Sequence, residues 1–176
     1  MGLRQTGFDH GMAAGVDVWP QVSCRPLSFS QTLVEPFTLN TNPVFAELSA
    51  GSLEQRRAAY ADTAWRERAR EYWNNTRAFR PRWSTMEIME SAAHPEHVGR
   101  RLNDLAAEMG VDVFDALMEL AVAEPDLMLR IKVVIANDDV DGVKALLNDP
   151  HTTLGLSDAG AHVGQLCDAP LPTDLL

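Results

Sequence analysis

The sequence predicts an α/β fold in which short strands alternate with helices. Four strand candidates are separated by segments with helical periodicity, and 45% of the 176 residues are apolar while 23% are charged, as in ordinary globular proteins. Strands that alternate with helices favour a parallel sheet with crossover connections. One folded domain is therefore the starting expectation.

The first strand is expected over residues 15–23, where Val16, Val18 and Val22 follow a period of two. Two helices follow a stretch punctuated by prolines. Ser52 opens the first helix with Gln55 three residues on, the spacing of a capping box. The second helix is expected from Asp62 to about Trp73, and both are expected to share one buried stripe: Tyr60, Trp65, Ala69 and either Tyr72 or Trp73. We expect residues 26–83 to form an exposed helical insertion.

The second half of the chain shows tighter patterns. Met86–Met89 is a strand candidate, and an apolar helix face over Val98, Leu102, Leu105 and Met109 stops at Gly110. The remaining expected elements are a helix capped by Asp112 that ends before Pro125, a strand within Leu127–Ala136, a helix capped by Asp138 or Asp139, and a strand over Thr152–Leu156.

Charge and cysteine content exclude several classes of function. The chain has 15 Lys and Arg against 25 Asp and Glu, a net charge of −10, which disfavours nucleic acid and anionic membranes as partners. It has no apolar run of about 18 residues and no apolar signal core near its start. Cys24 and Cys167 form no Cys-x-x-Cys pair and are expected as reduced thiols. These features predict a cytoplasmic protein.

The segment from Thr152 to His162 is the most informative for function. It delivers Ser157, Asp158 and His162 at the carboxyl end of the last strand, where parallel α/β folds build their active sites. In one alternative Asp158 caps a following helix and His162 lies on the surface. In another Gly155-x-Ser157-x-Ala159 is a nucleophile elbow, but no later histidine follows to complete a triad.

Two other segments allow a metal interpretation. Residues 137–142 resemble the start of a calcium loop, but Asn148 stands where a bidentate glutamate is needed, so the acidic residues are expected to stabilise a helix start. His94 and His97 are two imidazoles with no third ligand expected nearby, which favours a loop and helix start. The sequence has neither His-x-His nor His-Glu-x-x-His, so no complete metal site is expected.

Four stretches resemble the metal-dependent amidohydrolases of the N-acyl-D-amino-acid deacylase (D-aminoacylase) group. They are Val18–Leu27, His94–Glu96, Ala136–Asp139 and, most specifically, Gly155–His162. The resemblance runs over most of the chain and implies a TIM-like (β/α)8 barrel whose last strand ends in an aspartate beside a zinc site. Asp158 matches that aspartate, which moves a proton from metal-bound water to the departing amine and can also contact the metal.

The implied reaction is hydrolysis of a non-peptide C–N amide bond, most specifically in an N-acyl-D-amino acid. Arg25 and His162 each follow a predicted strand end and are expected to meet the substrate carboxylate. Their alternatives are a surface arginine and a turn histidine. A hydantoinase-like cyclic amidase is the near rival, and a noncatalytic remnant that packs or oligomerises is the rival from another class.

The sequence departs from the family by omission, because the first-strand His-x-His and the middle-strand metal ligands have no counterpart. We therefore expect a fragment with the late strands of the barrel, inactive alone, since a closed barrel needs about 200 residues or more. Self-association is expected through unpaired strand edges and through uncovered apolar faces, for example around Leu127 to Ile135.

Overall fold

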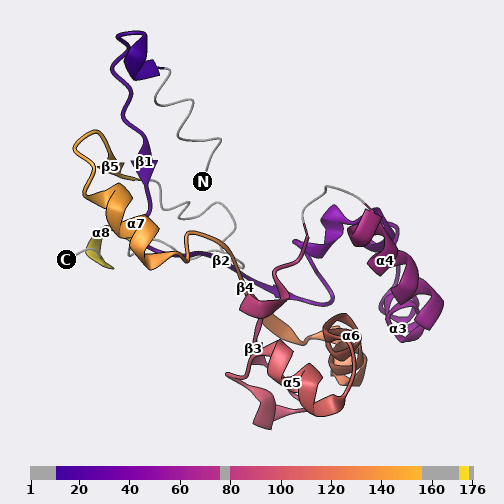
Figure 1. The fold of residues 1–176 in the computed structure, drawn as a ribbon. Helices are drawn as coiled ribbons and strands as arrows, with labels where there is room; N and C mark the ends of the chain where they lie inside the picture. Colours follow the sequence, from indigo (N-terminus) through magenta and orange to yellow (C-terminus); the bar gives the residue numbers. More distant parts are fainter. Residues whose placement is uncertain (1–10, 76–79, 156–170, 175–176) are drawn as a thin grey trace. The chain divides into compact units, whose positions relative to one another are not determined.

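The computed structural model describes residues 11–75, 80–155 and 171–174 (Figure 1). The chain divides into two compact units, Ser28–Ile135 and a second unit made of Met1–Leu27 with Ala136–Leu176. We call them the central unit and the terminal unit. Helices and strands occur in both, which confirms the α/β class. Of the described residues, none belongs to a helix with the length and apolarity needed to cross a membrane.

A three-stranded sheet in the order β2–β4–β3 runs through the central unit. Its strands are β2 (Leu27–Thr32), β3 (Glu87–Glu90) and β4 (Arg130–Ala136). β3 and β4 are antiparallel, with Ile88 opposite Ile131 and a register shift before Glu90. The expectation of parallel strands is wrong for this pair. Two helices connect β3 to β4. A single crossover helix would return the chain parallel to β3, whereas a second helix reverses it once more, so β4 runs antiparallel to β3.

Those two helices, α5 (Leu102–Met109) and α6 (Val113–Ala123), form a packed hairpin (Figure 1). Gly110 ends α5 in the left-handed conformation with φ +70°, and the Asp112 carboxylate caps α6 by accepting from the Phe114 N–H at 3.0 Å. Both boundaries confirm the sequence prediction. Val98 does not belong to the helix as expected, since it lies in an exposed turn before α5.

The two arginine-rich helices form as predicted, as α3 (Leu53–Ala61) and α4 (Thr63–Asn75). Ser52 and Gln55 make the reciprocal capping box, with hydrogen bonds of 3.2 and 2.8 Å. The expected stripe is buried at Tyr60, Trp65, Ala69 and Trp73. These side chains belong to the same core as residues from α6 and the short helix α2 (Pro43–Ala46). The stripe therefore contributes to the main core of the central unit.

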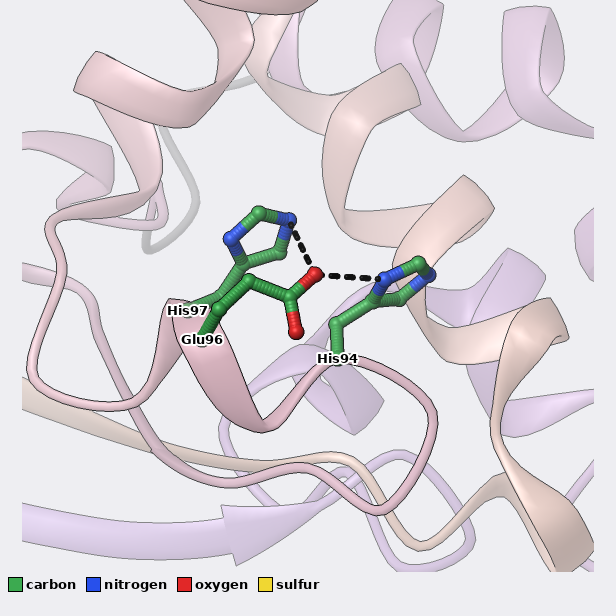
Figure 2. A group of neighbouring side chains, drawn as sticks. All are labelled: His94, Glu96 and His97. Carbon is green, nitrogen blue, oxygen red and sulfur yellow. Dashed lines mark hydrogen bonds and ion pairs between the residues drawn. The ribbon is translucent and has the colours of Figure 1, made fainter.

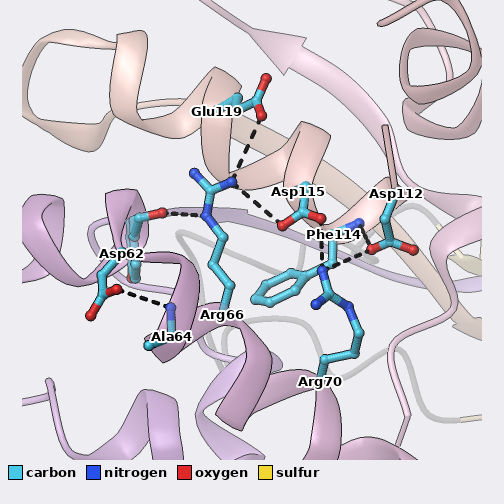
Figure 3. Close-up of polar contacts among 9 residues, drawn as sticks. Asp62, Ala64, Arg66, Arg70, Asp112, Phe114, Asp115 and Glu119 are labelled. Atoms are coloured by element: carbon cyan, nitrogen blue, oxygen red, sulfur yellow. Dashed lines mark hydrogen bonds and ion pairs between the residues drawn. The ribbon is translucent and has the colours of Figure 1, made fainter. Parts of the chain in front are cut away.

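Arginines of α4 fasten it to α6 (Figure 3). The buried Arg66 donates from Nε to the Tyr60 carbonyl at 2.6 Å and pairs with Asp115 at 3.4 Å. Arg70 pairs with Asp115 at 2.7 Å, and its guanidinium lies 5.7 Å from the centre of the Phe114 ring. Each charged group has a partner of opposite sign, so removal of one partner would leave the other charge unpaired between the helices.

The apolar face of the chain around β4 is covered. Leu127, Leu129, Ile131 and Val133 are all buried within the core of the central unit. The expectation of an uncovered face from Leu127 to Ile135 is therefore wrong for these positions. These positions are covered because the α5–α6 hairpin and its neighbours supply apolar side chains to the same core.

The terminal unit contains β1 (Gln21–Val22), α7 (Val140–Leu147), β5 (Thr153–Leu154) and α8 (Leu171–Asp174). Asp139 caps α7, and its side chain accepts from the Gly142 N–H at 3.0 Å. This confirms the helix-start interpretation of residues 137–142 over the calcium loop. β1 is shorter than the strand expected over 15–23, and its last residue, Val22, is buried.

Candidate functional site

The strand pair β1–β5 joins two segments that are about 130 residues apart in sequence. The pair is parallel, with Gln21 beside Thr153 and Val22 beside Leu154. Thr153 donates its N–H to the Pro20 carbonyl at 3.1 Å, and Gly155 donates to the Val22 carbonyl at 3.2 Å. Because the strands are parallel, their carboxyl ends lie at one edge. The loop after β1 leaves from that edge, where β5 also ends.

Gly155 is needed at the end of β5 for a steric reason. A Cβ atom built there would lie 2.6 Å from Cδ and 2.9 Å from Cβ of Gln21 on the neighbouring strand. Any side chain would therefore displace Gln21 or separate the strands. The close packing of the two strands therefore explains why residue 155 is a glycine, and a nucleophile elbow is not needed to explain it.

The loop after β1 is held by side-chain hydrogen bonds. The Asn137 amide donates from Nδ2 to the carbonyls of Ser23 and Arg25, each at 2.7 Å. Cys24 donates from Sγ to the Leu171 carbonyl at 3.4 Å. Asn137 has φ +64°, a left-handed conformation that asparagine tolerates better than most residues. Sequence reasoning missed this clamp because only the tertiary structure brings Asn137 to the loop.

Of the predicted site residues, Arg25 is the one that the structure describes. It is half-buried and follows β1 at the edge where β5 also ends. Asp158 and His162, along with Ser157 and Cys167, lie outside the described residues. The structure therefore fixes the strand that precedes Asp158 and His162, and their roles stay predictions.

A different group of side chains gathers in the central unit, at the turn η3 (Pro95–His97) (Figure 2). Its members are His94, Glu96 and His97, whose ligand atoms all lie within 4.8 Å of one another. The Glu96 Oε1 atom is 3.2 Å from Nδ1 of His94 and 3.9 Å from Nε2 of His97. We call this group the HPEH cluster. Among the residues that the structure describes, these three side chains have ligand atoms close enough together to share one metal ion.

The local fold explains why the three side chains meet. In a 3₁₀ turn, side chains three residues apart lie on the same side, which brings His94 and His97 together with ring centres 5.2 Å apart. The loop expected here is confirmed, and Glu96 is a third side chain close to the two histidines. Glu96 was between the histidines in sequence, and the turn places its carboxylate between the two rings (Figure 2).

Glu96 carries the negative charge of the cluster. Hydrogen bonding to its own backbone N–H, followed by the His94 hydrogen bond and the charges of both imidazoles, lowers the pKa of Glu96 below its ordinary value. Its carboxylate is therefore ionised at neutral pH. Nearby, Arg100 pairs with Glu108 and lowers the pKa of that carboxylate, chiefly through their hydrogen bond.

Comparison with known proteins gives distant relatives. The chain is 25% identical over 147 residues to uncharacterized proteins of Mycobacterium bovis and of two strains of Mycobacterium tuberculosis. The match covers 76% of this chain and 24% of each relative, so the chain spans about a quarter of the length of the relatives it matches. No protein-family model matches, and no solved structure matches significantly.

Proposed function

We propose that this chain contributes the late strands and the proton-carrying carboxylate of an amidohydrolase that acts on N-acyl-D-amino acids. The observation that carries the proposal is the parallel pair β1–β5. Val18–Leu27, one segment that carries the family resemblance, pairs here with Thr153–Leu154, which directly precedes another such segment, Gly155–His162, in the sequence. A shared carboxyl edge of parallel strands is where α/β barrels place catalytic groups. The partial TIM-like barrel is part of the proposal.

Within this proposal Asp158 acts as general base and then as general acid. It takes a proton from the attacking water and gives it to the amine that leaves when the amide C–N bond breaks. Arg25 and His162 are proposed to meet the substrate carboxylate. A guanidinium suits that task because it can donate two parallel hydrogen bonds to one carboxylate. The proposed location is the cytoplasm.

Zinc is the cofactor that the family resemblance implies. The described residues at the β1–β5 edge do not fit a zinc centre, because Cys24 is the soft ligand there and its thiol donates to the Leu171 carbonyl. The HPEH cluster belongs to the other unit.

The proposal is tested by two substitutions in a longer protein that contains this chain and is as long as the relatives that it matches. Asp158→Asn keeps size and polarity but removes the proton acceptor, so kcat on an N-acyl-D-amino acid should fall about 10²- to 10⁴-fold. Ser157→Ala should leave most of the turnover. Metal content is measured for both variants. If Ser157→Ala is inactive while Asp158→Asn keeps more than about a tenth of kcat, the acid–base role fails and a serine nucleophile replaces it.

A companion assay measures amine release from matched N-acetyl-D- and N-acetyl-L-amino acids and from a cyclic amide such as a hydantoin. Preference for the D-enantiomer supports the proposed substrate class. Hydrolysis of the cyclic amide alone would move the protein to the hydantoinase-like alternative. The absence of any hydrolysis would favour the noncatalytic alternative.

A further inference from the structure

The HPEH cluster has the spacing of a three-ligand metal site. Two ligand atoms on one tetrahedral zinc ion, each about 2.0–2.2 Å from it, are about 3.3 Å apart. The distances from the Glu96 Oε1 to the two imidazole nitrogens, 3.2 and 3.9 Å, bracket that value. Two imidazoles on such an ion have ring centres about 5 Å apart, and those of His94 and His97 are 5.2 Å apart. The three ligand atoms lie within 4.8 Å of one another.

The loop that carries the cluster is held in place before any ion binds. The buried Glu124 carboxylate accepts from the backbone N–H of Ala92 at 2.9 Å and of Ala93 at 3.2 Å, and from the Ser91 hydroxyl. Ser91 Oγ in turn accepts from the His94 N–H at 2.9 Å. The loop is thus fixed at the residue that bears the first imidazole, which reduces the entropy lost on binding.

The other end of the loop is fixed as well. The Gly99 N–H donates to the Ile88 carbonyl at 2.8 Å, and the Ile88 N–H donates to the Arg100 carbonyl at 3.0 Å. Nδ1 of His97 is enclosed by protein, so Nε2 is the nitrogen of this ring that faces Glu96. Each imidazole therefore presents one defined atom to the carboxylate.

Ligand chemistry selects the class of ion. Two imidazoles with one carboxylate suit zinc and neighbouring transition metals, whereas magnesium and calcium prefer sites made of oxygen ligands. The side chains of His94 and Glu96 are 37% and 63% exposed, so an ion reaches them directly from solvent and keeps water as its remaining ligand. The net charge of −10 also favours the approach of cations.

We propose that His94, Glu96 and His97 bind one exchangeable zinc-type divalent ion through Nδ1, the carboxylate and Nε2. The site lies wholly in the central unit and uses none of the three residues proposed to act in the amidohydrolase, Asp158, Arg25 and His162. The bound ion would link three side chains of the loop between β3 and α5. This inference is independent of the proposed function and fails or holds on its own test.

The test is a zinc titration of the untagged 176-residue chain in competition with a chromophoric chelator. One ion per chain is expected. Loss of an outer-shell partner typically weakens a metal site 10- to 100-fold, so His94→Gln, His97→Gln and Glu96→Gln should each weaken binding at least tenfold. The matched control is His151→Gln, which removes an exposed imidazole with Nδ1 3.6 Å from the Asp149 carboxylate. Its affinity should equal that of the parent chain.

Imidazole NMR resonances provide a second measurement. Those of His94 and His97 should shift on zinc addition while that of His151 stays in place, and circular dichroism verifies that each variant is folded. The inference is overturned by a lack of saturation at about 100 µM zinc, or by equal loss of affinity in His151→Gln. It is also overturned if Asp158→Asn abolishes binding and His94→Gln does not, since the ion would then belong to the proposed amidohydrolase centre.

Discussion

The two units differ in how they are held together. The central unit buries a continuous set of aromatic and aliphatic side chains, with Phe45 in ring contact with Tyr60, Trp65, Trp73 and Phe114. In the described part of the terminal unit, the buried apolar side chains are Val22 and Leu171. There the contacts are strand pairing, the Asn137 clamp and the cap of α7.

This difference predicts that the units respond differently to substitution. Burial of apolar area is the largest favourable term in folding, whereas single hydrogen bonds each contribute about 1 kcal/mol net. Core truncations in the central unit should therefore change global stability. Polar substitutions in the described terminal unit should act locally.

The largest effect is expected for Phe45→Ala. Phe45 is fully buried at the centre of the aromatic group, and truncation removes its contacts and leaves a cavity. A loss of about 3–5 kcal/mol in the free energy of unfolding is expected. Urea denaturation followed by tryptophan fluorescence measures it. Leu146→Ala on α7, which is 40% exposed, is the matched control and should change stability by less than about 0.5 kcal/mol. Equal effects would remove the contrast between the units.

Alkaline pH should destabilise the central unit through Tyr60. Burial raises the pKa of this phenol to about 12 against 10.0 for the ordinary group, with Arg56 acting in the opposite direction. The folded state keeps its proton longer, so stability is full below pH 10 and falls as the pH rises toward 12. The loss amounts to about 2–3 kcal/mol.

Denaturation at pH values from 8 to 12 tests this expectation, with Tyr60→Phe as the control. The phenylalanine variant loses the hydrogen bond from the hydroxyl to the Leu33 carbonyl, at 2.9 Å, and about 1 kcal/mol at neutral pH. Its stability should then depend less steeply on alkaline pH. An unchanged slope would assign the alkaline loss to other groups.

Glu124→Gln should destabilise the loop that carries the HPEH cluster. The amide keeps one acceptor oxygen but turns an N–H group toward backbone donors, so about 2 kcal/mol is expected to be lost. Hydrogen exchange at Ala92 and Ala93 should accelerate, because their N–H groups bond to the carboxylate. Glu119→Gln in α6, the helix that ends just before Glu124, is the control, since that side chain is about half exposed. Unaltered exchange at both alanines would contradict the role of Glu124.

The smallest effects compare two helix caps. Ser52→Ala removes the capping box of α3, and Asp139→Ala removes the cap of α7. Each should cost about 1 kcal/mol. We expect Ser52→Ala to shift the unfolding midpoint of the central unit and Asp139→Ala to accelerate hydrogen exchange within α7 alone. A midpoint shift of the same size for both would show that the units unfold together.

Local signals account for the elements that were predicted correctly. The capping box at Ser52, the glycine after α5 and the aspartates before α6 and α7 act within one turn of their helices, so the sequence around them contains the whole interaction. The buried stripe of α3 and α4 follows from helical periodicity in the same way.

Local signals were insufficient where the outcome depends on distant partners. The strand expected over 15–23 is shorter in the structure, because pairing with β5 supports Gln21 and Val22. The role of Glu124 was not visible because its carboxylate bonds to residues about thirty positions away. At the candidate site, sequence reasoning placed Arg25 after a strand, but it did not find the Asn137 clamp on that loop.

By itself, the sequence determined the α/β class, the caps of α3 and α6, the end of α5 at Gly110 and the charge that disfavours nucleic acid as a partner. Each depends on composition or on contacts between near neighbours in the chain. Only the tertiary structure decided the antiparallel course of β4, the parallel pairing of β1 with β5 and the meeting of Glu96 with two imidazoles. The strand pairings join segments that are far apart in sequence, and the cluster needs a backbone turn held by Glu124. Residue spacing contains neither kind of information.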